Sequence, residues 1–168
     1  MRELTSAAAN KLLKALEDEK SYYLEMEADA SIYVLAEGEK VEAPEYDYEA
    51  TQQRIDEIDE KIRKIKHVIN GFNTTTYLEP LSITIDEALV QMAQLNRKKM
   101  KLDTMRKRLP KSRVKSDFYN RSNLIEYEYV NYEVSKVQED YQQVCDQITS
   151  IQMALDLINQ TKVFSVDL

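Results

Sequence analysis

The sequence predicts a mainly α-helical fold of long antiparallel helices, about four in number, in a coiled-coil-like bundle with a few short β-strands at one end. The 168 residues include only 2 Gly and 3 Pro, so few turns interrupt the chain and long elements are expected. Two stretches repeat apolar residues at alternating spacings of three and four, which is the pattern of a helix with one buried face. We therefore expect one helical domain over residues 1–168.

The first helix is expected over residues 3–36. Leu4, Leu12 and Leu16 begin an apolar face that Tyr23 extends at helical spacing. Gly38 is expected to end this helix. Residues 37–48, EGEKVEAPEYDY, then form an acidic linker.

The second helix, expected over residues 49–73, has a heptad stripe that is almost all isoleucine. The stripe predicts a narrow buried face with a solvated back. The residues of this seam are Ile55, Ile58, Ile62, Ile65, Ile69 and Phe72. Residues 77–83, around Pro80, are expected to be extended.

The third helix, expected over residues 85–109, opens with a capping box. In Thr84-Ile85-Asp86-Glu87 the Thr84 hydroxyl accepts a first-turn amide and Glu87 accepts the amide of Thr84. Pro110 ends the helix. Lys99 and Arg106 share the heptad position of its apolar stripe, so their aliphatic stems are expected to cover apolar surface. The stripe itself comprises Leu89, Met92, Leu95, Leu102, Met105 and Leu109.

The fourth helix, expected over residues 132–160 with Asn131 as its N-cap, has the longest regular stripe. Residues 124–130 and 162–168 flank it as short strands. Since strands need a ladder of hydrogen bonds, we expect the extended pieces to pair with one another, or with a second copy, in one small β cap. The seam comprises Val134, Val137, Tyr141, Val144, Ile148, Ile151, Leu155 and Ile158.

Charge is distributed unevenly along the chain. Residues 17–60 hold 16 acids against three bases, a net charge of −13, whereas residues 97–115 hold ten bases against Asp103, a net charge of +9. Such asymmetry indicates either matching between neighbouring helices or subunits, or an external partner.

The sequence lacks the patterns that are typical of membrane-spanning, secreted, metal-binding and catalytic proteins. No apolar run reaches the length of a membrane span, and the N-terminal residues lack a signal peptide, so a cytoplasmic protein without a transmembrane segment is expected. His67 and Cys145 are the only residues of their types, so we expect no metal, no cofactor and no catalytic site. We accordingly expect a protein that is not an enzyme.

The order of parts resembles a family of small uncharacterised bacterial helical proteins, some of which carry the label septicolysin. The similar pieces are the linker EGEKVEAP, the turn INGFNTTT, the helix start LSITIDEAL and the run FYNRSNLIEYEYV, which together span nearly the whole chain. In the family an aromatic-Arg-Ser run stands where this chain has Tyr119, Arg121 and Ser122, with Asn120 interrupting it. The resemblance implies the same helical fold, and the label implies membrane lysis.

The sequence predicts a non-enzymatic helical homo-oligomer that acts as a structural or protein-interaction module. Exposed tyrosine clusters are typical of interfaces, and thin helical bundles are commonly covered by copies of themselves. The alternatives are contact with another protein, a nucleic-acid-associated role for the basic segment, and the membrane-active role that the label implies. The expected oligomer contacts are Leu124, Tyr127, Tyr129, Val163 and Val166, and the basic candidates are Arg97, Lys98, Lys101, Arg108, Lys111, Arg113 and Lys115.

Overall fold

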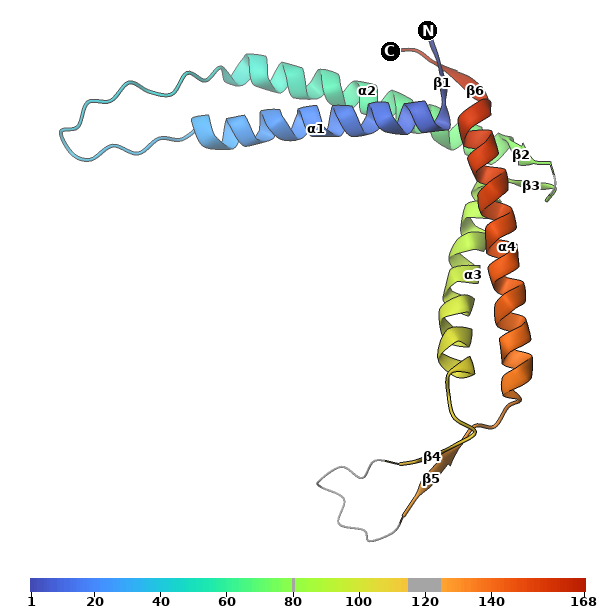
Figure 1. Cartoon of the computed structure of the whole chain (residues 1–168). Helices are drawn as coiled ribbons and strands as arrows, with labels where there is room; N and C mark the ends of the chain where they lie inside the picture. Colours follow the sequence, from blue (N-terminus) through green and yellow to red (C-terminus); the bar gives the residue numbers. More distant parts are fainter. Residues whose placement is uncertain (80, 115–124) are drawn as a thin grey trace. The chain divides into compact units, whose positions relative to one another are not determined.

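The structure, a computed structural model, describes residues 1–79, 81–114 and 125–168. Within these residues the fold is mainly α-helical, as predicted, with four helices and six short strands (Figure 1). The chain divides into two compact units, one formed by residues 1–77 with 156–168 and the other by residues 78–155. The prediction of a single domain did not distinguish these units.

The first unit is built on an antiparallel helix pair, α1 (Ser6–Ala30) and α2 (Tyr48–Thr75) (Figure 1). The isoleucine stripe of α2 forms the inner face, as its spacing predicted. Ile55, Ile58 and Ile65 are buried, and Ile62 and Ile69 are half-buried. They pack with residues of α1 and the two terminal strands; the buried members of this cluster are Leu4, Ala9, Leu13, Leu16, Ile58, Ile65 and Val166.

Helix α1 is shorter at both ends than the predicted span of 3–36. Its N-cap is Thr5, whose hydroxyl accepts the amide of Ala8 at 3.2 Å. The helix ends at Ala30, and Gly38 lies further on, in a turn with a φ of +87°. The side chains of Ile32 to Leu35 are 40–91% exposed, so little packing supports a helix in residues of modest helix propensity.

The two ends of the chain form a sheet that the sequence did not reveal. Strands β1 (Arg2–Thr5) and β6 (Val163–Val166) pair antiparallel, with Leu4 opposite Phe164. Residues 3–5 were predicted as helix, which was wrong. Their backbone groups are satisfied by a partner about 160 residues away in the chain.

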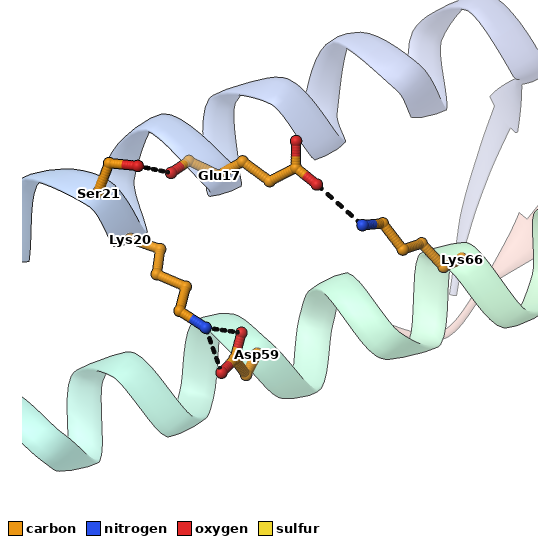
Figure 2. Close-up of polar contacts among 5 residues, drawn as sticks. All are labelled: Glu17, Lys20, Ser21, Asp59 and Lys66. Carbon is orange, nitrogen blue, oxygen red and sulfur yellow. Dashed lines mark hydrogen bonds and ion pairs between the residues drawn. The ribbon is translucent and has the colours of Figure 1, made fainter. Parts of the chain in front are cut away.

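Ion pairs cross the α1–α2 pair and agree with its antiparallel register. Figure 2 shows Nζ of Lys20 between both carboxylate oxygens of Asp59, at 2.7 and 2.6 Å, and Nζ of Lys66 at 2.9 Å from Oε1 of Glu17. These side chains are partly exposed, so each pair contributes about 0–1 kcal/mol. The later residue of α1 pairs with the earlier residue of α2, as an antiparallel arrangement requires. The ion pairs therefore favour this relative alignment of the two helices.

The second unit contains α3 (Ile85–Arg106) and most of α4 (Val134–Thr161) (Figure 1). The predicted capping box is present: Glu87 donates its amide to the Thr84 hydroxyl at 3.2 Å, and the Thr84 amide donates to the Glu87 carboxylate at 2.8 Å. These hydrogen bonds satisfy two amides at the helix start. The pKa of the Glu87 carboxyl group is lowered, mainly because its carboxylate accepts the hydrogen bond from the backbone amide of Thr84.

The seam of α4 is confirmed, and that of α3 is narrower than predicted. Leu95 and Leu102 are buried, but Leu89 and Leu109 are exposed. Helix α4 begins at Val134, so Asn131 is not its N-cap. The buried α4 seam residues are Val137, Val144, Ile148, Ile151, Leu155 and Ile158, while Tyr141 is half-buried.

In the described residues the strands form three separate two-stranded sheets, so the prediction that the extended pieces pair in one β cap was wrong. Strand β2 (Tyr77–Leu78) pairs with β3 (Ile83–Thr84), and β5 (Tyr127–Tyr129) pairs with β4 (Lys111–Arg113). The partner of β2 lies in the same predicted extended stretch. The partner of β6 was predicted as helix, and the partner of β5 lies in the basic segment. In the residues that the structure describes, no helix has the length and apolar character to cross a membrane.

Candidate functional site

The end of the α1–α2 pair that holds the connecting loop presents apolar side chains to solvent. We call residues 22–46 of this region the distal surface. Ile32 is 76% exposed and Val34 is 91% exposed, and Val41 is also exposed. Exposed apolar side chains gathered in one segment mark interaction sites more often than scattered ones do.

The loop of the distal surface is attached to both helices through one carboxylate. Tyr46 donates its hydroxyl to Oε1 of Glu27 at 2.5 Å, and Gln52 donates its side-chain amide to the same oxygen at 2.8 Å. The hydrogen bond to Glu27 is the main reason that the pKa of Tyr46 is raised to about 12. Glu27 therefore joins α1, the returning loop and α2.

A cavity of about 450 Å³ lies beside this attachment, between α1 and the loop. Its lining is mixed: the Tyr22 ring, Met26 and Pro44 are apolar, while Glu25 and Asp29 supply two carboxylates one helical turn apart. This combination suits a cation on an aliphatic stem, because carboxylates bind the charge and the apolar atoms contact the stem.

The second surface is a β-hairpin at the end of α3, residues 107–114 with 125–130, here called the basic hairpin. Lys111 lies opposite Tyr129 in the ladder and Arg113 opposite Tyr127. Nζ of Lys111 lies 4.1 Å from the centre of the Tyr127 ring and 5.4 Å from that of Tyr129. As predicted from their alternation, the two tyrosines share one face of the sheet.

The other face of the basic hairpin is held by an ion pair and hollowed by a smaller cavity. Nη1 of Arg108 lies 3.3 Å from Oε1 of Glu128. A cavity of about 300 Å³ adjoins this pair, with Leu109, Ser112 and Val130 completing its lining. Arg108 is therefore engaged within the hairpin.

Asp103 partly neutralises the base of the hairpin. It accepts hydrogen bonds from Lys107 and Arg106, which lower its pKa, and the Arg106 guanidinium lies 4.2 Å from the centre of the Tyr141 ring. The half-buried Arg106 fits the prediction that its stem covers apolar surface. Its charge is taken up by Asp103 and the Tyr141 ring.

The remaining predicted site residues fall in several places. Arg97, Lys98 and Lys101 are exposed on α3, and Arg113 is exposed on β4. Tyr127, Tyr129 and Val163 are exposed, as oligomer contacts require. Val166 is 1% exposed within the core of the first unit, so assigning it to an oligomer contact was wrong. Lys115 and Leu124 lie outside the described residues.

The described residues hold no cluster of His, Cys, Asp and Glu suited to a metal ion. His67 is exposed on α2, and Cys145 is half-buried on α4. A wider hollow of about 690 Å³ is lined by residues of α2 alone. The cavity of the distal surface adds Pro44 of the loop to five residues of α1, so its lining comes from two segments of the chain.

Sequence reasoning missed Glu25 and Asp29, the carboxylates of the distal cavity. They belong to a segment with so many acids that spacing alone carries no signal. The available signal was the helical spacing of the segment. Tyr22 and Met26 lie on the same two turns as Glu25 and Asp29, so apolar and acidic side chains share these turns without a nearby base.

Comparison with known proteins finds no matching family model and no matching curated protein. A solved structure described as a functionally unknown conserved protein from Corynebacterium diphtheriae is similar, with a TM-score of 0.67 and 14% sequence identity. The match covers 98% of this chain and 100% of that chain. At this identity the likeness shows the fold alone, and it does not bear on the resemblance to proteins labelled septicolysin.

Proposed function

We propose that this protein is a non-enzymatic interaction module that associates with copies of itself through the distal surface. The observation that carries the proposal is the segment of exposed apolar residues, Ile32 and Val34 above all, on a loop that Glu27 attaches to two packed helices. The hydrogen bond of Tyr46 limits the freedom of the end of the loop next to α2, which reduces part of the entropy lost when the loop binds.

Charge supports association rather than simple solubility. Residues 25–49 carry nine acids and one base, Lys40, a net charge of −8. In contrast, the acids near the middle of α1 are matched: Glu17 pairs with Lys66, and Glu19 pairs with Arg54 at 2.6 Å. The unmatched charge is thus concentrated where the apolar residues are exposed.

The test is the molar mass in solution, measured by light scattering behind a sizing column. The wild type is expected to exceed the 19.7 kDa of one chain, and Ile32→Lys with Val34→Lys is expected to reduce the mass toward that value. Val90→Lys is the matched control, because Val90 is an exposed apolar residue of α3. A wild-type mass of one chain across the concentration range would refute the proposal, as would an unchanged mass for the double variant.

A second candidate function, binding of nucleic acid, is favoured by one observation. Arg97, Lys98 and Lys101 are exposed within two turns of α3, where they suit a phosphate backbone. Phe118 and Tyr119, the side chains expected to stack on bases, lie outside the described residues, and the rings of Tyr127 and Tyr129 are already in contact with Lys111. Retention of labelled single-stranded nucleic acid at low salt, released steeply as salt rises, would support this candidate.

Membrane activity remains a proposal that rests on the resemblance to septicolysin-labelled proteins. Release of a trapped dye from liposomes tests it directly. Absence of release from both neutral and anionic liposomes would remove it.

A further inference from the structure

The two surfaces described above are opposite in charge and both carry exposed apolar groups. The distal surface holds seven acids against Lys40, a net charge of −6, and the basic hairpin holds four bases against Glu126 and Glu128, a net charge of +2. Leu109, Val114 and Ile125 are exposed on the basic hairpin. Opposite charge with apolar groups on both sides is the pattern of complementary interface halves.

The charges available on the basic hairpin can be sorted by what they already contact. Lys107 is held by Asp103, Arg108 by Glu128, and Lys111 lies over tyrosine rings. Arg113 makes no ion pair within the part of the chain that the structure describes, and it stands at the end of β4 away from α3. It is therefore the arginine of this hairpin best placed to reach another surface.

The distal cavity has the chemistry to receive an arginine. Glu25 and Asp29 offer two carboxylates to a guanidinium, which binds carboxylates through paired hydrogen bonds. Met26 and Pro44 offer apolar contact to the stem, and the exposed Tyr22 ring can stack against the guanidinium plane. A nucleic acid would instead be repelled by these carboxylates.

We propose that the distal surface of one copy binds the basic hairpin of a second copy, with Arg113 of that copy between Glu25 and Asp29. This inference rests on the proposed function, for which it names the partner. The second copy is favoured because every chain carries both surfaces, in equal number and with charges of opposite sign. Such a contact joins different surfaces, so copies add head to tail and form a ring or an open chain.

Two variants separate the halves of this contact. The distal variant is Glu25→Lys with Asp29→Lys, and the hairpin variant is Arg113→Glu. Each alone is expected to run at 19.7 kDa at low salt, whereas a 1:1 mixture is expected to regain the wild-type mass. Mixing restores both kinds of contact: the intact hairpin of the distal variant meets the intact distal surface of the hairpin variant, and the two mutated surfaces are again opposite in charge and can pair with each other.

The charge-swapped chain with all three substitutions restores opposite charge and is expected to regain the wild-type mass. Asp18→Lys with Asp156→Lys is the matched control: both acids are exposed, lie outside the two surfaces, and change the net charge by the same amount as the distal variant. Circular dichroism should show the wild-type helix content in every variant.

The outcomes distinguish this inference from the proposed function. If both variants dissociate but their mixture stays at the mass of one chain, the head-to-tail contact is overturned while association through the distal surface stands. If the distal variant remains assembled, both this inference and the proposed function are overturned. If only the hairpin variant remains assembled, the distal surface binds some other part of a second copy, which overturns the assignment of Arg113 and the hairpin.

Discussion

Replacing Ile58 by alanine tests whether the isoleucine stripe of α2 forms the core of the first unit. Ile58 is 0% exposed and packs in the cluster of α1, α2 and the terminal strands. The substitution removes three carbons, a transfer loss of about 2.4 kcal/mol at roughly 0.8 kcal/mol for each. The cavity left behind adds to this, so we expect the free energy of unfolding to fall by about 3–4 kcal/mol.

Ile62→Ala is the matched control, because it removes the same three carbons from the same helix one turn later. Ile62 is only half-buried, so we expect a loss of about 1–2 kcal/mol. The gain in helix propensity is identical for both and cancels in the comparison. Urea denaturation followed by circular dichroism measures both. If Ile58→Ala costs no more than Ile62→Ala, the stripe does not face the core as described.

Three further predictions concern the cap, the loop attachment and the terminal sheet. Thr84→Ala should lower stability by about 1 kcal/mol in the same urea experiment while Thr84→Ser retains it, because only the hydroxyl accepts the Glu87 amide. Alkaline titration of tyrosine absorbance should show one group with a pKa near 12 that Tyr46→Phe removes. Val166→Asp should strongly destabilise the first unit, whereas Val163→Asp should change stability little, since only Val166 is buried.

The sign of the Tyr46 prediction follows from linkage. The hydrogen bond to Glu27 favours the neutral phenol, so the pKa in the folded state lies above the ordinary value of 10.0. The contribution to stability is fully present below pH 10 and is lost as pH rises toward about 12. A titration that is the same for the wild type and Tyr46→Phe, apart from one ordinary tyrosine, would contradict it. Equal stability of Thr84→Ala and Thr84→Ser would contradict the prediction for the cap. Equal stability of Val163→Asp and Val166→Asp would contradict the prediction for the terminal sheet.

The sequence predicted elements whose cause is local. The isoleucine spacing of α2 and the stripe of α4 reflect one-sided burial, and periodicity reports that directly. The capping box at Thr84 closes within four residues, so its geometry is encoded where it occurs. These features were placed within a few residues of their observed positions.

Strand partners could not be predicted for the opposite reason. Arg2–Thr5 contains Leu4, which suits a helix face as well as a strand, and its partner β6 lies at the other end of the chain. Lys111–Arg113 is a charged tripeptide that becomes a strand because β5 pairs with it. In both cases the decisive hydrogen bonds come from residues far away in sequence, which no local pattern contains.

The candidate surfaces illustrate a related limit, because a surface is defined by what remains uncovered after folding. Tyr22 and Tyr23 are neighbours on α1, yet Tyr22 is exposed and Tyr23 packs against the core. The sequence also could not show which charges would be matched within the chain. Glu128 takes up Arg108, whereas Glu25 and Asp29 line an open cavity.

The distribution of matched and unmatched charge carries the argument for association. Exposed ion pairs each contribute about 0–1 kcal/mol, so those between α1 and α2 add little to stability and mainly fix alignment. Net charges of −8 and +8 in residues 25–49 and 97–114 repel within each segment and oppose folding. An opposite surface removes that repulsion and lets the exposed apolar groups be buried. Because salt screens these charges over about 10 Å at 0.1 M, assembly through these surfaces must weaken as salt is added, whereas purely apolar assembly would not.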